Sequence, residues 1–109
     1  MPRWQVVVTD PARGDIRAAL HRTRDEFGTG QAERYRAAIR AALQRLRAGP
    51  SVPGSRPVHP SRPGLRKLHL SGRARHVLIF RQGEGHVLFV VRVLHDAMDV
   101  IRHLPPETP

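Results

Sequence analysis

The fold is decided by residues 75–94, RHVLIFRQGEGHVLFVVRVL. Two runs rich in apolar and β-branched residues, Arg75–Arg81 and His86–Leu94, are typical of β-strands. They flank Gly83-Glu84-Gly85, and glycines in so short a connection indicate a hairpin turn. The stretch therefore predicts two antiparallel strands that lie side by side.

A third strand is expected at Leu65–Leu70 (LRKLHL), because Ser71-Gly72 is a further turn signal before the hairpin. The three strands would form an antiparallel meander. The last strand is apolar on both faces except at His86 and Arg92, so we expect it in the centre of the sheet. Alternation along it places Val87, Phe89, Val91 and Val93 on one face, and His86, Leu88, Val90, Arg92 and Leu94 on the other.

A further strand is predicted near the N-terminus. Trp4–Thr9 (WQVVVT) has the β-branched composition of a strand and stops at Asp10-Pro11. Thr9 or Asp10 is placed to cap a helix that carries Pro11 in its first turn. A strand that leads directly into a helix follows.

Two helices are predicted between this strand and the meander. Apolar residues recur at spacings of three and four over Pro11–Phe27 and again over Gln31–Ala48, with Gly28-Thr29-Gly30 between them. So short a connection indicates an antiparallel helix hairpin whose apolar stripe packs on the sheet. The stripe comprises Ile16, Ala19, Leu20, Thr23 and Phe27, then Tyr35, Ala38, Ile39, Ala42, Leu43 and Leu46.

The remaining segments are a proline-rich loop and a short helix. Pro50–Gly64 contains five prolines in fifteen residues, which excludes a helix and a central strand. A loop of this length is either functional or partly disordered. Asp96–Leu104 predicts a short helix that ends at Pro105-Pro106, so 105–109 would be a tail. We interpret residues 1–109 as a single α+β domain.

Charge dominates the composition. The chain has 19 Lys and Arg against 9 Asp and Glu, a formal net charge of +10, and Lys67 is its single lysine. A polyanionic partner is expected, and arginine suits carboxylates as well as phosphates. The absence of cysteine, and of any signal-peptide or membrane-span pattern, predicts a cytoplasmic protein.

The closing run Val91–Leu104 (VRVLHDAMDVIRHL) resembles the signature of ParE toxins, which commonly end the last strand in Arg-x-x-His and continue with Met or Arg, Asp and an aliphatic residue. The resemblance extends to Ala32–Tyr35, Pro63–Arg66 and Arg75–Arg81, and so covers nearly the whole chain. It implies the two-layer fold of the ParE/RelE superfamily, whose β-α-α-β-β-β order matches the predicted elements.

The resemblance implies the toxin of a type II toxin–antitoxin system, a plasmid-stabilisation type, that inhibits DNA gyrase without catalysis. A cognate ParD-like acidic antitoxin would neutralise it in a hetero-oligomer. The RelE branch shares the fold but cleaves messenger RNA on the ribosome, and the position where RelE enzymes usually carry a mid-sheet arginine falls on Val77. A RelE-like endoribonuclease would use Arg66, Arg75, Arg92 and His95. A basic nucleic-acid-binding domain is a third hypothesis, weakened by an aromatic content of 5%.

The residues expected to bind the antitoxin or the target lie on the meander and just after it. They are Arg66, Lys67, Arg73, Arg75, Arg81, Arg92, His95, Met98 and Asp99. The cations on the meander, together with His69, are alternatively a solvated edge that blocks aggregation. Arginines on the two long helices more simply coat a solvated face, although the groove between these helices suits an amphipathic antitoxin helix.

Two of these residues have a structural alternative. Arg92 interrupts an apolar strand, so it either pairs internally with Asp96 or Asp99 or binds a partner. His95 either caps the end of the strand or acts in catalysis. Asp99 is expected to hold local structure.

No cofactor or metal is expected. The seven histidines lack the tight spacing of a zinc site, and neither a nucleophile motif nor a glycine-rich phosphate loop is present.

Overall fold

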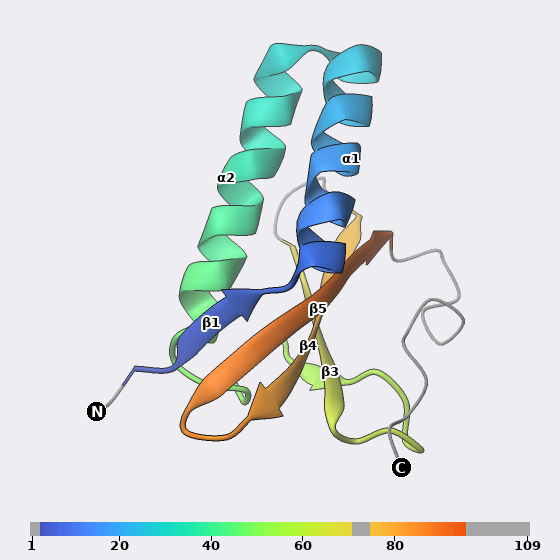
Figure 1. Cartoon of the computed structure of the whole chain (residues 1–109). Helices are drawn as coiled ribbons and strands as arrows, with labels where there is room; N and C mark the ends of the chain where they lie inside the picture. Colours follow the sequence, from blue (N-terminus) through green and yellow to red (C-terminus); the bar gives the residue numbers. More distant parts are fainter. Residues whose placement is uncertain (1–2, 71–74, 96–109) are drawn as a thin grey trace.

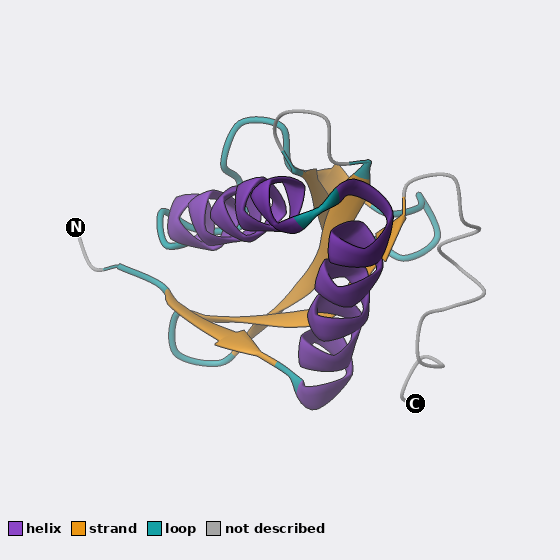
Figure 2. Cartoon of the chain, turned by 90° about the horizontal axis from the view of Figure 1, so that it is seen from above, coloured by secondary structure: helices purple, strands orange, loops and turns teal. Residues whose placement is uncertain are grey.

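The computed structural model describes residues 3–70 and 75–95. Its elements are β1 (Gln5–Val8), α1 (Asp10–Phe27), α2 (Thr29–Leu46), β2 (Arg56–Pro57), β3 (Leu65–His69), β4 (His76–Gly83) and β5 (Val87–His95). The five strands form one sheet in the order β1-β5-β4-β3-β2, in which β1 is parallel to β5 and the other neighbours are antiparallel. Figure 1 shows β1 beside β5, and Figure 2 shows both helices on one side of the curved sheet.

The predicted α+β class, N-terminal strand, helix hairpin, meander and central last strand are confirmed. The predicted helix at 96–104 and the tail at 105–109 lie outside the described residues. The boundary between the two long helices was wrong, because Gly28 alone separates them and Thr29 and Gly30 belong to α2. Gly28 has a φ of 91°, which only glycine adopts readily, so a single residue suffices to reverse the chain.

Thr9 joins the start of α1 to β5. Its hydroxyl accepts a hydrogen bond from the Ala12 amide as the N-cap, and donates to the Val90 carbonyl at 3.0 Å. The Thr9 amide also donates to the Val90 carbonyl, at 3.1 Å. Thus the residue that begins the helix also extends the parallel pairing of β1 with β5 by one step.

The main core lies between the helices and the sheet. It combines the inward faces of α1 and α2 with Leu68, Leu78, Phe80, Leu88 and Val90, and all five are fully buried. Burying a side chain of this size stabilises the fold by about 1.5–3 kcal/mol. A second cluster, formed by Leu65, Val77, Ile79 and Leu94, lies on the other face of the sheet. Phe27 was wrongly placed on the buried stripe: its side chain is 70% exposed, because α1 extends beyond the sheet before it ends.

A β-bulge changes the face to which the end of β5 points. Ile79 pairs with Arg92 and Phe80 pairs with Val90, so Val91 is an additional residue on β5. The predicted alternation was therefore wrong for Val93 and Leu94, which follow the bulge, and right up to Val91. Val93 joins Leu88 and Val90 in the main core, while Val91 and Leu94 contribute to the second cluster.

The proline-rich loop is attached to the rest of the protein. Its residues Arg56–Pro57 form the edge strand β2, and Val52 is buried in the main core. The Arg45 guanidinium of α2 donates to the Pro53 carbonyl. Proline is tolerated here because β2 lies at the sheet edge, where its missing N–H removes no central hydrogen bond.

Within the described part of the chain, neither helix has the length and apolarity needed to cross a membrane.

Replacing Thr9 by valine is expected to lower the free energy of unfolding by about 1–2 kcal/mol, because valine keeps the shape but removes the cap and the bond to Val90. Urea unfolding followed by circular dichroism measures the change. Thr29→Val is the matched control, since α2 has no side-chain cap at its start. Equal losses for the two variants would contradict the role of Thr9.

Candidate functional site

Four cationic or titratable side chains share the face of the sheet that is turned away from the helices. Lys67 pairs with Ile79 and Arg81 pairs with Leu65, and both partners belong to the second cluster on that face. Arg56 lies directly opposite Lys67 on β2. His69 follows by alternation along β3. We call Arg56, Lys67, His69 and Arg81 the basic sheet face.

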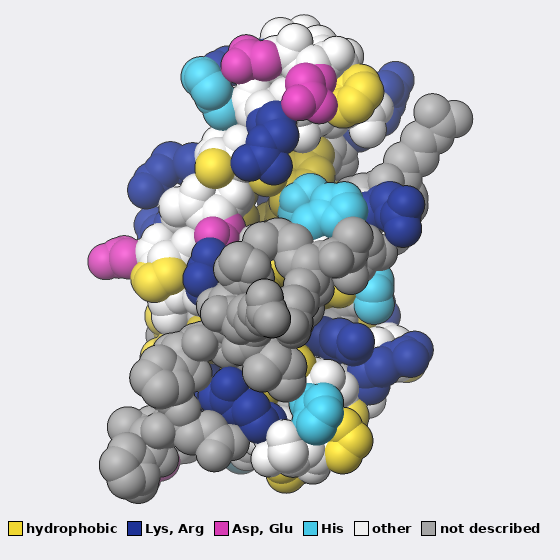
Figure 3. Space-filling model, turned by 90° about the vertical axis from the view of Figure 1, so that its right-hand side faces the viewer, with side chains coloured by type: hydrophobic (Ala, Val, Ile, Leu, Met, Phe, Trp, Pro, Cys, Tyr) yellow, Lys and Arg dark blue, Asp and Glu magenta, His cyan; other side chains and the backbone are white. Residues whose placement is uncertain are grey.

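Figure 3 shows how charge is distributed on one side of the molecule. Lys and Arg side chains occur over the whole of this view, whereas the acidic side chains in view lie mainly toward its upper and left part, at the level of the helices. Among the side chains visible in this view, cations therefore predominate below the upper part of the helices, which favours attraction of an acidic partner.

Arg81 has a defined orientation on this face. Its guanidinium carbon lies 4.6 Å from the centroid of the Phe89 ring, on the residue directly opposite in β5. Phe89 in turn lies against Gly83, where a Cβ atom would stand 2.5 Å from the ring. A glycine at the end of β4 therefore leaves room for the ring on which Arg81 rests.

The Arg66 side chain donates hydrogen bonds to other residues of the protein. Its Nε donates to the Pro50 carbonyl at 3.0 Å and to the Ser55 hydroxyl at 2.8 Å, and one terminal nitrogen donates to the Ser55 carbonyl at 3.1 Å. The side chain therefore ties the proline-rich loop to β3. These contacts give Arg66 a structural role.

Arg92 forms an internal ion pair with Asp15 of α1, a partner that was not predicted. Two of its nitrogens donate to the two carboxylate oxygens of Asp15 on α1, at 2.7 and 3.0 Å. Asp15 also accepts a hydrogen bond from the Val93 amide at 2.9 Å. The hydrogen bond to Asp15 raises the pKa of Arg92, although burial opposes this. The proposed partners Asp96 and Asp99 lie outside the described residues.

His76, the first residue of β4, lies beside His95, the last residue of β5. They are opposite each other in register, with ring centroids 5.4 Å apart, and the Tyr35 ring of α2 lies 5.2 Å from His76.

Arg75 immediately precedes β4 and is exposed. Val77 is buried, as befits its place in the second cluster. Of the four residues proposed for an endoribonuclease, Arg66 donates to the proline-rich loop and Arg92 donates to Asp15 of α1.

Tyr35 was expected only as a core residue, yet it carries a buried hydroxyl. Within the described residues, this oxygen has no hydrogen-bond partner. Burial raises the pKa of Tyr35 well above its usual value, the negative charge of Asp15 raises it further, and Arg22 opposes the change. The neutral phenol is therefore the form that the fold stabilises.

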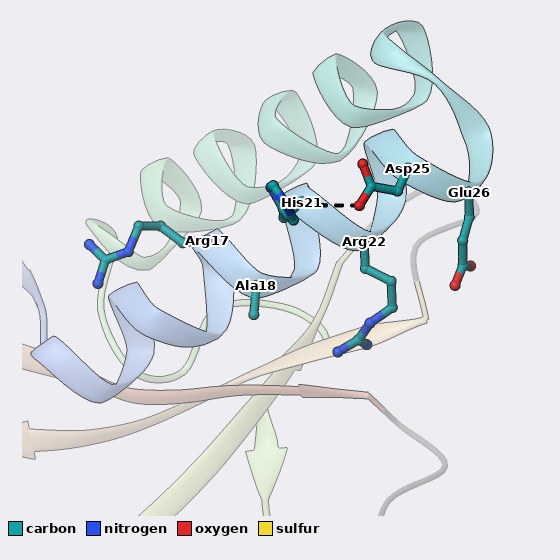
Figure 4. Close-up of a pocket in the computed structure, with 6 residues that line it drawn as sticks. All are labelled: Arg17, Ala18, His21, Arg22, Asp25 and Glu26. Carbon is teal, nitrogen blue, oxygen red and sulfur yellow. Dashed lines mark ion pairs between the residues drawn. The ribbon is translucent and has the colours of Figure 1, made fainter.

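The outer surface of the helix hairpin has mixed charge. Figure 4 shows a shallow hollow along α1, lined by Arg17, Ala18, His21, Arg22, Asp25 and Glu26, in which His21 and Asp25 approach to 3.8 Å. A groove between α1 and α2 shares Arg17 and His21 and adds Arg24, Glu33 and Arg36. Since Glu33 lies 3.6 Å from Arg36, part of this positive charge is offset locally.

Of the remaining predicted site residues, Arg73, Met98 and Asp99 lie outside the described part of the chain. Among residues 3–70 and 75–95, no three His, Asp or Glu side chains are grouped as a metal ion would require.

Comparison with known proteins assigns the family. Residues 6–100 match the family described as ParE toxin of type II toxin-antitoxin system, parDE. The chain belongs to the ParE toxin family. It is 42% identical over 83 residues to Toxin ParE1 of Mycobacterium tuberculosis, a match that covers 75% of this chain and 79% of that protein. It is 28% identical over 98 residues to Toxin ParE of Escherichia coli, with 90% of each chain covered.

Two solved structures have the same fold. The chain superimposes on a structure of the chromosomal ParDE toxin–antitoxin system from Pseudomonas aeruginosa with a TM-score of 0.70, 21% identity and coverage of 84% of this chain and 95% of that one. A structure of the toxin–antitoxin complex RelBE2 from Mycobacterium tuberculosis gives a TM-score of 0.58 with 22% identity, over 90% of this chain and 97% of that one. The ParE/RelE-like fold inferred from the sequence is confirmed, and the protein is the toxin of a type II toxin–antitoxin system.

Asp15, Phe89 and Gly83 were not predicted as parts of the site. Asp15 and Arg92 are 77 positions apart, so helical periodicity gave no sign of the pairing. Phe89 and Gly83 carried a weak signal, because glycine within a strand often marks a close approach.

The ion pair between Asp15 and Arg92 is expected to stabilise the fold more than a surface pair does. In a double-mutant cycle with Asp15→Asn and Arg92→Gln, we expect a coupling of about 1–3 kcal/mol in the free energy of unfolding, since the contact is bidentate and charge-assisted. The exposed pair of Glu33 and Arg36 is the control, with an expected coupling below about 0.5 kcal/mol. Similar couplings for both pairs would contradict this ranking.

Tyr35 is expected to make the protein less stable at alkaline pH. Its pKa is higher in the folded state than the ordinary value of 10.0, so its contribution is complete below pH 10.0 and is lost as pH rises above that value. The free energy of unfolding should fall less steeply above pH 10.0 in Tyr35→Phe. Since the chain has one tyrosine, tyrosinate absorbance reports this group alone. Ionisation near pH 10.0 in a protein that stays folded would count against the burial effect.

Proposed function

We propose that this ParE-family toxin inhibits DNA gyrase, and that a ParD-like antitoxin neutralises it by covering the basic sheet face. The family assignment supports the general role. The relative named Toxin ParE1 covers most of this chain, and the structural neighbours come from toxin–antitoxin systems.

The observation that carries the antitoxin proposal is the arrangement of cations on the sheet. Arg56, Lys67 and Arg81 share one face, in a chain with a net charge of +10. The partly exposed Val91 lies beside them on β5. An acidic segment that also carries apolar side chains would match both features.

Internal bonding favours inhibition over catalysis. Two of the four residues that an endoribonuclease would use, Arg66 and Arg92, already donate several hydrogen bonds within the protein. Cations that must stabilise a phosphate in a transition state need donors directed at the substrate. A non-catalytic inhibitor has no such requirement.

The RelE-like endoribonuclease is the second candidate, and the contact of His76 with His95 favours it. Two imidazoles 5.4 Å apart provide groups of the type that general acid–base cleavage of RNA requires. In such a reaction, the 2′-hydroxyl attacks the neighbouring phosphate while one ring takes its proton and the other protonates the leaving oxygen.

The purified toxin is expected to inhibit supercoiling of relaxed plasmid by gyrase and to leave ribosome-bound mRNA intact. Addition of the ParD-like antitoxin should restore supercoiling, with an association rate that falls as salt rises, because attraction between the charged surfaces steers the encounter. Cleavage of mRNA without inhibition of gyrase would reverse the ranking of the two functions.

A triple variant locates the antitoxin surface. Replacing Arg56, Lys67 and Arg81 by glutamine should slow antitoxin association at least about tenfold at low salt. The control replaces Arg34 and Arg40 of α2 and its C-cap residue Arg47 by glutamine, which removes the same charge from the helix side of the sheet. Equal slowing in both variants would show that net charge, not the basic sheet face, steers the antitoxin.

A further inference from the structure

The arginines of this protein differ in how their donors are used. Arg66 donates to the proline-rich loop and Arg92 donates to Asp15. Arg45 and Arg13 donate to the carbonyls of Pro53 and Val8. These four guanidinium groups therefore contribute to the fold itself.

Arg81 is placed differently. Among the described residues, its guanidinium has one partner, the ring of Phe89, and takes part in no ion pair or hydrogen bond. A guanidinium that rests on an aromatic ring keeps the N–H donors along its edge directed to solvent. The exposed Arg81 thus presents an intact donor set on the basic sheet face.

The position of Arg81 is fixed through two further residues. Phe89 is directly opposite Arg81 in the β4–β5 register, and its ring fills the space above Gly83 that any Cβ would occupy. The β4 backbone at Gly83 limits movement of the Phe89 ring toward β4. The Arg81 guanidinium lies over this ring. An arginine held in this way loses less side-chain entropy when it binds a carboxylate than a freely moving one does.

We propose that Arg81, held by Phe89 over Gly83, is the anchor through which the basic sheet face grips a carboxylate of its acidic antitoxin. The inference rests on the proposed function and specifies one contact within it. Arg81 makes the contact, whereas Phe89 and Gly83 are positioning residues. A planar guanidinium forms two parallel hydrogen bonds with a carboxylate, which a lysine cannot do.

Equilibrium binding of the purified ParD-like antitoxin tests the proposal. Arg81→Gln should weaken binding about 10–100-fold, and Arg81→Lys should restore only part of the loss although it restores the charge. Phe89→Leu should weaken binding several-fold without any change in charge. The double variant should bind no more weakly than Arg81→Gln alone, because Phe89 acts through Arg81.

Arg40→Gln on the exposed face of α2 is the matched control for the loss of one positive charge. Urea unfolding of each variant separates a binding effect from a loss of stability. Gly83→Ala is a second route to the same test, because it displaces the ring and leaves both partners present. The proposal is overturned if Arg81→Gln weakens binding no more than Arg40→Gln, or if the effects of Arg81→Gln and Phe89→Leu simply add.

A labelled poly-L-glutamate distinguishes this proposal from the proposed function. If the antitoxin fails to bind the wild-type toxin, the proposed neutralisation is wrong, and the Arg81 anchor is then judged on poly-L-glutamate alone. Tighter binding of this probe to the wild type than to Arg81→Gln, beyond the difference seen with Arg40→Gln, supports the anchor. Equal binding overturns it.

Discussion

The edge of β5 beyond Val90 is the constraint on which the structure depends. There β1 has ended, and an unpaired backbone edge inside a protein is costly unless its donors and acceptors find partners. Thr9 bonds the Val90 carbonyl, and Asp15 accepts from the Val93 amide while holding Arg92. The first two turns of α1 thus take the place of the missing strand and fix the helix hairpin to the sheet.

This arrangement divides the positive charge into two groups. Some arginines bond within the protein, such as Arg92 of β5 to Asp15 of α1 and Arg66 of β3 to the proline-rich loop. Others, such as Arg81, are displayed on the sheet. The formal charge of +10 does not distinguish these groups, although only displayed cations are available to a partner. Internal pairing of Arg92 also explains how a charged residue is accommodated in a strand that is otherwise apolar.

Local patterns predicted the elements of this fold well, and long-range contacts explain where prediction failed. The two helices and the meander follow from periodicity and turn residues, which act over a few positions. The parallel pairing of β1 with β5 and the contact of Asp15 with Arg92 join distant parts of the chain, so no local pattern reveals them. The bulge at Val91 reverses the alternation that assigned Val93 to the wrong face. Phe27 has the spacing of a core residue, but the sheet does not reach it.

The parallel pairing of β1 with β5 has a consequence for synthesis on the ribosome. The first strand finds its sheet partner only when residues 87–90 have left the exit tunnel, about eighty positions later. Until then, the apolar side of the helix hairpin lacks the part of its cover that Leu88, Val90 and Val93 of β5 contribute. A nascent toxin therefore cannot assume its native architecture until nearly all of residues 3–95 have been translated, which delays the appearance of an active molecule to the last stage of each round of translation.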